Sequence, residues 1–218
     1  MIQTCSHLST DVIYKVYLTN EWQELYNEII NGFSSQPSDD EDPILCSLIL
    51  SDSLLSVSIL INKENGNNEN EIFISANQNL IQFISEQLLQ FILNLLQEKS
   101  SNLQYLIYCY QLINHIFKFN ERMTEQIISL NSNLMLISQE MVQFSLNIKE
   151  VPSDNPFFEL LFKKIMKFST TCALNPHLSS LINIEYISSF LPIIQEIFKS
   201  DMSNSVKCSA LQFLKEIF

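Results

Sequence analysis

The sequence predicts an all-α fold, and three observations lead to that prediction. Apolar residues recur every three or four positions along most of the 218 residues, whereas almost no stretch alternates apolar and polar residues as a strand would. Glycine occurs only twice, at Gly32 and Gly66, although all-β folds depend on glycine in their turns. Hydrophobic residues make up 46% of the chain, which is enough to bury a sizeable core.

The first third of the chain predicts three helices separated by polar loops, at residues 7–18, 21–32 and 44–60. Gly32 is expected to end the second helix, because glycine is common just past a helix end. The acidic loop at residues 34–43 leads into the third helix, and Pro43 suits the first turn of that helix. The polar, Asn-rich segment at residues 62–71 is expected to be a loop.

The remaining two thirds of the chain predict eight more helices, at residues 78–98, 101–119, 121–130, 133–148, 155–172, 176–183, 185–199 and 204–218. Two of them have clear start signals. Pro156 follows Asp154 or Asn155, and Pro176 likewise follows Asn175. A capping residue followed by proline is typical of the start of a helix.

The segment that starts at Asn120 aligns with the segment that starts at Asn175. Each reads as a short helix, a longer helix and a third helix, with a period of about 45–55 residues. Residues 7–61 and 72–119 fit two looser copies, so the chain predicts about four three-helix units. One such unit cannot cover its own apolar faces, and neighbouring units are therefore expected to stack.

The last unit contains LPIIQEIFKSD followed by SNSVKCSALQFLKEI, which resembles the consensus of armadillo and HEAT repeats at Asp201, Val206, Lys207, Ala210 and Leu211. YQLINHIFKFNERMTEQII at residues 110–128 is similar to an armadillo third helix that leads into the next unit. The resemblance covers about half of the chain. It implies a right-handed α-α superhelix in which residues 72–218 form one continuous solenoid and residues 1–71 form a loosely matching N-terminal unit.

The resemblance also implies a partner-binding groove. In armadillo proteins the third helices line a concave groove, where asparagines bind the backbone of an extended peptide. The matching positions here are Asn114, with Tyr110 one turn before it where import receptors carry tryptophan, and Ser169 and Gln212 in the equivalent stretches. The alternative interpretation of Asn114 is an asparagine on a solvated helix face.

A strip of lysines is the other candidate binding feature. Lys163, Lys164 and Lys167 share about one face of a predicted helix, and Lys207 and Lys215 lie on the last helix. In a chain of net charge −12, such a strip is expected to attract an acidic segment or a phosphorylated tail of a partner protein. The alternative is that these lysines only solubilise an exposed face. The overall negative charge argues against nucleic acid as a partner.

The sequence predicts neither an enzyme nor a metal or cofactor site. Two distant glycines cannot form a phosphate-binding loop, and the five cysteines contain no CxxC pair. They suit small buried hydrophobes in a reducing compartment. Cys109 and His115 are six residues apart on one predicted helix, which turns them to different faces. A helical hydrolase that gathers such groups in space remains a third class of function.

Three further features bear on location and regulation. The N-terminus lacks the pattern of a signal peptide. Pro43–Ile61 approaches the length of a membrane span but is interrupted by Asp52 and serines, so no membrane association is expected. These features favour a cytoplasmic or nuclear location. Ser38 begins an S-D-D-E sequence that suits an acidophilic kinase.

The expected function is a non-catalytic scaffold or adaptor that presents a curved helical groove to a protein or an extended peptide. The alternative is an obligate structural or regulatory subunit of a larger complex. In that case an uncapped C-terminal end, with Phe213 and Phe218 exposed, would dock on another chain, on a second copy or on more of a longer parent chain.

Overall fold

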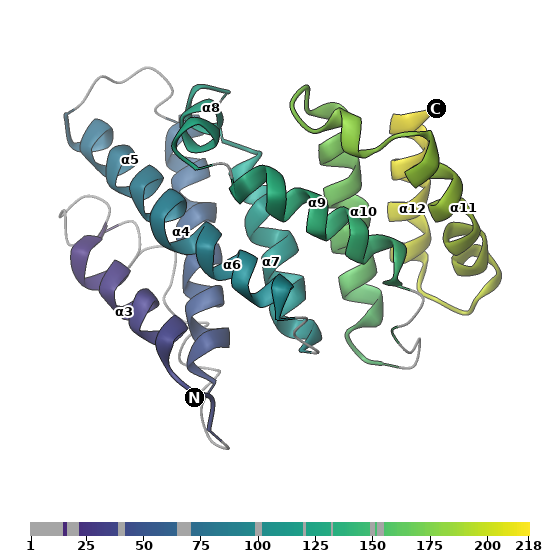
Figure 1. Cartoon of the computed structure of the whole chain (residues 1–218), viewed down its shortest axis with the longest axis horizontal. Coiled ribbons are helices and arrows are strands. Elements are labelled where there is room, and N and C mark those ends of the chain that lie inside the picture. The colour runs from purple at the N-terminus through teal and green to yellow at the C-terminus, as the bar shows by residue number, and fades with distance from the viewer. Residues whose placement is uncertain are drawn as a thin grey trace. The chain divides into compact units, whose positions relative to one another are not determined.

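A computed structural model of the protein describes residues 15–16, 22–38, 42–64, 71–98, 102–119, 121–131, 133–148, 151 and 155–218 (Figure 1). These residues form helices and turns with no strand among them, which confirms the all-α prediction for this part of the chain. The predicted helix at residues 7–18 lies outside the described residues apart from Lys15 and Val16, which are helical. Residues 39–41 of the acidic loop and residues 65–70 of the Asn-rich loop also lie outside them.

The helices, in chain order, are α3 (Trp22–Ser34), α4 (Pro43–Glu64), α5 (Glu71–Phe83), a π-helical turn (Ile84–Leu88), α6 (Leu89–Gln97), α7 (Leu103–Ile116), α8 (Glu121–Leu130), α9 (Asn133–Leu146), α10 (Phe158–Leu174), a 3-10 turn (Ser179–Leu181), α11 (Ile184–Lys199) and α12 (Asn204–Ile217). They form two compact units. Unit 1 contains the described residues up to Asn94 together with those of His115–Asn133, and unit 2 contains those of Leu95–Asn114 and Leu134–Phe218. Residues on both sides of the predicted boundary at residue 71 belong to unit 1, where α5 packs against α3.

Helix α4 supplies much of the core of unit 1. It starts at Pro43, as predicted, and the Asp42 carboxylate accepts a hydrogen bond of 2.9 Å from the backbone N–H of Leu45. Within the described part of the chain, only Pro43–Ile61 is long and apolar enough to cross a membrane. In the structure Leu48 and Leu54 of this segment are fully buried, which fits a core helix of unit 1.

The position of Gly32 differs from the prediction. Gly32 does not end its helix, because α3 continues to Ser34. A Cβ atom at this position would collide with the Ser47 hydroxyl and would lie 2.9 Å from the backbone carbonyl oxygen of Pro43. Glycine is therefore needed here for the close approach of α3 to α4, and not for a left-handed helix end.

Replacing Gly32 with alanine is expected to lower the free energy of unfolding by about 1–3 kcal/mol, because the added methyl group overpacks this contact. The loss should appear even though alanine favours a helix interior by about 1 kcal/mol relative to glycine. Urea unfolding of Gly32→Ala and of the double variant Gly32→Ala/Ser47→Ala measures the effect. The double variant should recover part of the loss, and a higher unfolding midpoint in Gly32→Ala would contradict the close-packing role.

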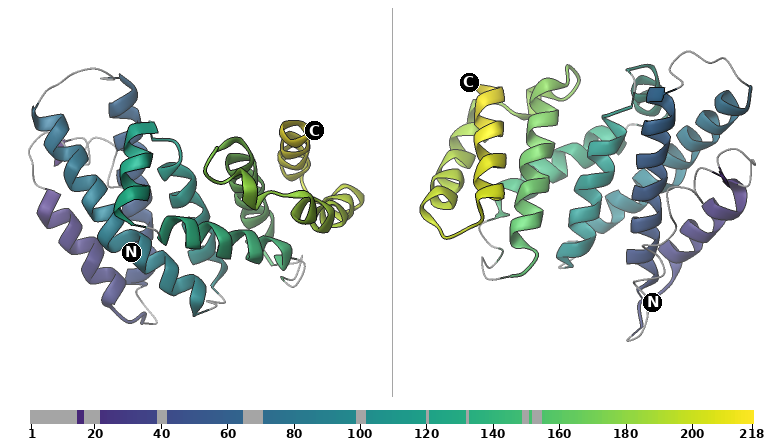
Figure 2. Two further views of the ribbon diagram at one scale, coloured as in Figure 1. Left: turned by 45° about the horizontal axis from the view of Figure 1, so that its top comes forward. Right: turned by 180° about the vertical axis from the view of Figure 1, so that it is seen from behind.

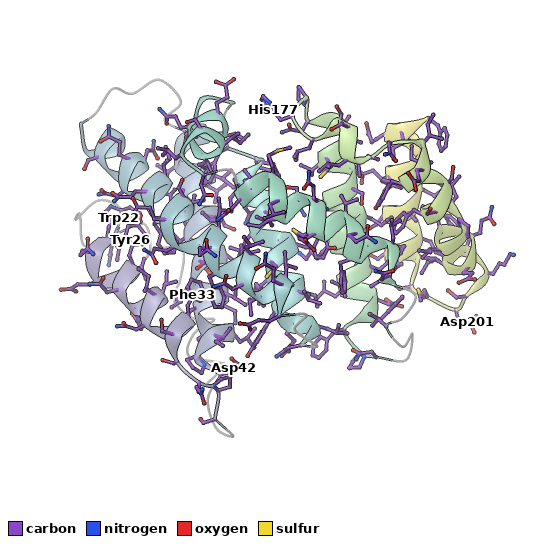
Figure 3. All side chains as sticks on the ribbon, in the orientation of Figure 1. Trp22, Tyr26, Phe33, Asp42, His177 and Asp201 are labelled. Carbon is purple, nitrogen blue, oxygen red and sulfur yellow. The ribbon has the colours of Figure 1, made fainter. Side chains whose placement is uncertain are left out.

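Aromatic side chains along α3 hold it against the rest of unit 1 (Figure 3). The ring of Tyr26 stacks on Trp22 at 5.7 Å and on Phe83 of α5 at 4.7 Å between ring centroids. Phe33, two turns further on, stacks on Phe91 of α6 at 3.9 Å. Stacked rings add to the stabilisation from burial alone, so these pairs fix the position of α3 on α5 and α6.

The middle of unit 1 contains a π-helical turn that the sequence does not predict. Residues 78–98 are expected to form one α-helix, but α5 begins earlier, at Glu71, and Ile84–Leu88 form the π turn. The Asn131 side-chain amide donates a hydrogen bond to the backbone carbonyl of Ser85 within that turn. The Asn-rich loop is also shorter than predicted, because α4 continues to Glu64.

Three helices of unit 2 meet at Phe190 of α11. Its ring lies 6.2 Å from that of Phe162 in α10 and 5.8 Å from that of Phe213 in α12, and all three rings are buried. Helices α10 and α12 lie side by side and face the viewer in the right panel of Figure 2, with α11 behind them. Unit 2 therefore has α10 and α12 side by side, with α11 packed against α12 and in contact with α10 through Phe162 and Phe190.

The connection between α10 and α11 also differs from the prediction. The Asn155 and Asn175 side chains each accept a 2.9 Å hydrogen bond from the backbone N–H two residues later, but Asn155 does not cap α10, which starts at Phe158 without a side-chain cap. The predicted helix at residues 176–183 is only a turn and one 3-10 segment. The Asn183 side chain accepts a 2.8 Å hydrogen bond from the backbone N–H of Tyr186 and starts α11.

Candidate protein-interaction surface

The side of α10 that points away from the core carries leucines and lysines at helical spacing. Leu160, Lys167 and Leu174 follow one another at intervals of seven residues, and all three are exposed. Lys163 lies between the first two on the same side and is half-buried. The exposed fraction of Leu174 is 61%, which is high for a leucine on a helix whose opposite side forms a core.

Helix α12 has a similar outer stripe. Cys208, Leu211 and Lys215 are exposed at intervals of three and four residues, so they share one side of the helix. Leu211 is 55% exposed and Phe218, in the same register, is 83% exposed.

The stripes on α10 and α12 face the same side of unit 2. The buried side of each helix points toward α11, because Phe162 and Phe213 both contact Phe190. The opposite sides therefore point away from α11 together, and the two helices are neighbours. We call this surface the outer face and define it by six residues: Leu160, Lys163, Lys167, Leu174, Leu211 and Lys215.

The lysine strip that the sequence predicts is only partly reproduced. Lys163 and Lys167 belong to the outer face, and Lys164, which is half-buried, lies at its edge. Lys207 points elsewhere, since its Nζ donates a 2.8 Å hydrogen bond to the backbone carbonyl of Ser200 at the end of α11. Gln212 is exposed on α12, beside Leu211.

Tyr110 and Asn114 of α7 are not on a surface where a peptide could reach them, so their proposed contacts with a partner are wrong for this structure. Both side chains are buried. The Asn114 Oδ1 accepts a 3.1 Å hydrogen bond from Thr171, and the Tyr110 ring packs edge-on against Phe168 at 5.4 Å. The reason is that α9 and α10 cover the side of α7 that the repeat pattern places in a groove.

Tyr110 is part of a buried hydrogen-bond network inside unit 2. Its hydroxyl lies 2.7 Å from the Met141 carbonyl and 3.1 Å from the Ser145 hydroxyl, and the Tyr186 and Ser169 hydroxyls lie 2.7 Å apart. Burial raises the pKa of Tyr110 and of Tyr186 above the usual tyrosine value, although hydrogen bonds partly oppose the shift. Both phenols therefore stay neutral, as a structural network requires.

The two C-terminal phenylalanines have opposite environments. The expectation that Phe213 is exposed is wrong, because its ring is 1% exposed and packs on Phe190. Phe218 is 83% exposed, as expected. A spacing of five residues on a helix turns the two side chains to different sides, so only Phe218 can serve as part of an interface.

The cysteines and the histidine that were considered for catalysis do not lie in environments that would activate them. Burial raises the pKa of the Cys109 thiol to about 12 and also raises that of Cys172, so neither forms the reactive thiolate. The His115 Nδ1 lies 3.1 Å from the Asp52 carboxylate and 3.4 Å from the Ser56 hydroxyl in unit 1. Both groups approach the same ring nitrogen, whereas a catalytic triad needs the serine and the carboxylate on opposite nitrogens.

Ser38 follows α3 and is exposed. Its three acidic followers lie outside the described residues. Phosphorylation at Ser38 therefore stays a prediction, which mass spectrometry of the native protein can check.

Glu159 joins the start of α10 to the start of α12. Its carboxylate accepts hydrogen bonds from the backbone N–H of Ser203 at 3.0 Å and from the Ser203 hydroxyl at 2.7 Å. Hydrogen bonds from the side chain and then the backbone of Ser203, with a smaller attraction to Lys163, hold the pKa of Glu159 below its usual value. The serine that precedes α12 thus binds a carboxylate of α10 instead of capping its own helix.

The contact between Glu159 and Ser203 is expected to make the stability of unit 2 depend on pH. A lowered pKa in the folded state means that the stabilisation is present above the usual glutamate pKa and is lost as the pH falls through the folded pKa. Glu159→Gln should therefore unfold at lower urea concentration than the native protein at pH 7, and the two should converge as the pH falls through the folded pKa of Glu159. The exposed Glu185→Gln is the control, and an unchanged difference across this pH range would contradict the prediction.

The sequence alone missed the apolar part of the outer face. Leu160 and Leu174 are not singled out by the sequence, although the other apolar residues of α10 complete a core side without them. The signal that distinguishes these two leucines from the buried apolar residues of α10 is their seven-residue spacing from Lys167.

The interpretation of this surface rests on its own residues and geometry. The comparisons with known proteins add no relative to which the chain could be assigned. No protein-family model, no curated protein and no solved structure matches the chain.

Proposed function

We propose that this protein is a non-catalytic interaction scaffold that binds a partner protein on the outer face of unit 2, in the cytoplasm or the nucleus. The observation that carries the proposal is the set of exposed leucines, Leu160, Leu174 and Leu211, at helical spacing around lysines. Exposed apolar side chains rimmed by polar ones are typical of protein–protein interaction sites.

The order of the helices supports an armadillo/HEAT-like stack as the architecture of this scaffold. A short helix and two longer ones follow one another in α8, α9 and α10, and a 3-10 turn replaces the short helix before α11 and α12. Helices α10 and α12 are the third helices of these two successive three-helix repeats, and they lie side by side. In a right-handed superhelix, equivalent helices of successive repeats would line one binding surface in this way.

Site-specific photo-cross-linking tests the proposal. A benzoylphenylalanine placed at Leu174 or Leu211 should form adducts with a partner protein in cell extract. The control position is Leu130 of α8, which is 65% exposed, compared with 61% for Leu174. Adducts at Leu174 and Leu211 but not at Leu130 would support the proposal, and equal or absent adducts at all three positions would overturn it.

The second candidate function is an obligate subunit of a larger complex that docks through the end formed by α11 and α12. Its support is that Ile184 and Phe218 are each 83% exposed, more than any other large hydrophobic residue in the described part of the chain. An end-docking subunit should associate as its concentration rises in sedimentation experiments. Ile184→Ser with Phe218→Ser should prevent that association, whereas a monomer at every concentration would favour the scaffold.

A further inference from the structure

The outer face presents apolar and cationic groups in a regular order. Along α10 the order is leucine, lysine, lysine, leucine, from Leu160 through Lys163 and Lys167 to Leu174, a length of about 21 Å at the helical rise of 1.5 Å per residue. On α12, Lys215 follows Leu211 one turn later. A complementary partner therefore has negative side chains flanked by apolar ones.

The charge of the outer face is opposite to that of the chain. The protein has a net charge of −12, yet none of the six residues of the outer face is acidic. The one carboxylate of α10, Glu159, accepts hydrogen bonds from Ser203, stays charged and attracts Lys163, so its charge lies at one edge of the face. The only acidic residue of α12, Glu216, shares a side with Ser209 and Gln212 and not with Leu211. The lysines of the outer face thus form a local site for negative charge on an acidic protein.

The backbone N–H and C=O groups of the partner find hydrogen-bond partners more readily in a helix than in an extended chain. An extended peptide needs hydrogen-bond partners for its own N–H and C=O groups. Two of the three side chains that the armadillo resemblance assigns to that task, Asn114 and Ser169, are buried in unit 2, where they bond to Thr171 and Tyr186, and Gln212 alone is exposed. A helix satisfies its own backbone and needs only an apolar stripe, which Leu160, Leu174 and Leu211 can receive.

We propose that the outer face binds an acidic amphipathic helix of a partner protein, about 14 residues long, with its leucine-like stripe against the leucines and its carboxylates against Lys163, Lys167 and Lys215. This inference rests on the proposed scaffold function and names the class of partner. A membrane surface is disfavoured as the occupant. An anionic bilayer is a broad plane that would also meet the negative charge of the rest of the chain, whereas a single helix meets only the outer face.

Fluorescence anisotropy with synthetic peptides tests this assignment on the full chain. The probe is an 18-residue labelled peptide with leucine at every third or fourth position and glutamate and alanine elsewhere. It should bind in a saturable way that weakens with added salt, because exposed charges are screened. A peptide with serine in place of leucine should bind at least about tenfold more weakly, because the apolar stripe is lost.

Two charge-reversal variants separate local from overall charge. Lys163→Glu/Lys167→Glu/Lys215→Glu changes the outer face, and Lys15→Glu/Lys118→Glu/Lys199→Glu changes three exposed lysines elsewhere. Each substitution alters the charge by two units, so both variants move the net charge from −12 to −18. The first should weaken the acidic peptide at least about tenfold and the second by less than about twofold. Circular dichroism and thermal unfolding test whether both triple variants are folded. If the outer-face variant is not folded, Lys167→Gln provides a milder change on the same face.

Three outcomes would overturn the inference. They are no binding of the acidic peptide, equal weakening by both triple variants, and binding of phosphatidylserine vesicles that only the outer-face variant loses. If the peptide fails but photo-cross-links at Leu174 and Leu211 persist, the acidic helix is wrong and the scaffold function stands. If the cross-links fail as well, both are wrong.

Discussion

Replacing Phe190 with alanine is expected to lower the free energy of unfolding of unit 2 by about 3–5 kcal/mol. The ring is fully buried and contacts Phe162, Phe213 and Tyr186, the last at 5.3 Å between centroids. Truncation leaves a cavity where α10, α11 and α12 meet. It also removes three aromatic contacts, each of which adds about 0.5–1.5 kcal/mol to the stabilisation from burial.

The matched control lies on the same helix. Phe198 of α11 is 36% exposed, so Phe198→Ala should cost less than about 1 kcal/mol. Urea unfolding followed by circular dichroism measures both variants against the native chain. Equal losses in the two variants would mean that Phe190 does not join the three helices. Because the outer face depends on the same junction, Phe190→Ala should also weaken binding of the acidic peptide.

Replacing Tyr110 with alanine is expected to cost about 3–5 kcal/mol, since it empties a fully buried site and breaks the hydrogen bonds to Met141 and Ser145. Tyr110→Phe keeps the ring against Phe168 and removes only the hydroxyl, so it should cost about 1–3 kcal/mol. The difference between the two variants separates packing from hydrogen bonding. Thermal unfolding gives both values.

A double-mutant cycle checks the network itself. Ser145→Ala alone should be destabilising, and Tyr110→Phe with Ser145→Ala should cost less than the two single losses combined, because the partners share one interaction. Strict additivity would show that the two hydroxyls, 3.1 Å apart, do not stabilise each other. Unchanged stability in Tyr110→Ala would contradict the burial of this residue and return it to the surface that the sequence predicts.

The sequence predicts the helices of this protein better than their environments. Helix α8 has the bounds expected from periodicity, and α11 and α12 differ by one residue at single ends. Periodicity indicates helices because helix geometry depends on residues that are close in the sequence. It does not report a π turn, which is stabilised in unit 1 by Asn131, a residue far away in the sequence. Nor does it report that Gly32 serves close packing, which depends on the position of Ser47.

The candidate site could be predicted only in part, for a related physical reason. Lys163 and Lys167 lie together because one helix fixes their spacing. Which side of α7 is covered depends instead on α9 and α10, and these bury Tyr110 and Asn114. Phe213 is buried because Phe190 meets it across two helices. Such contacts between distant segments cannot be read from a single degenerate repeat.

The cysteines give the protein a convenient native probe. Among the cysteines that the structure describes, Cys109 and Cys172 are buried, Cys46 is half-buried and Cys208 is exposed. Maleimide dyes react with accessible thiolates, so brief labelling should modify Cys208 before these others. The dye would then sit one turn from Leu211, and its emission should report an arriving ligand in real time without any engineered tag.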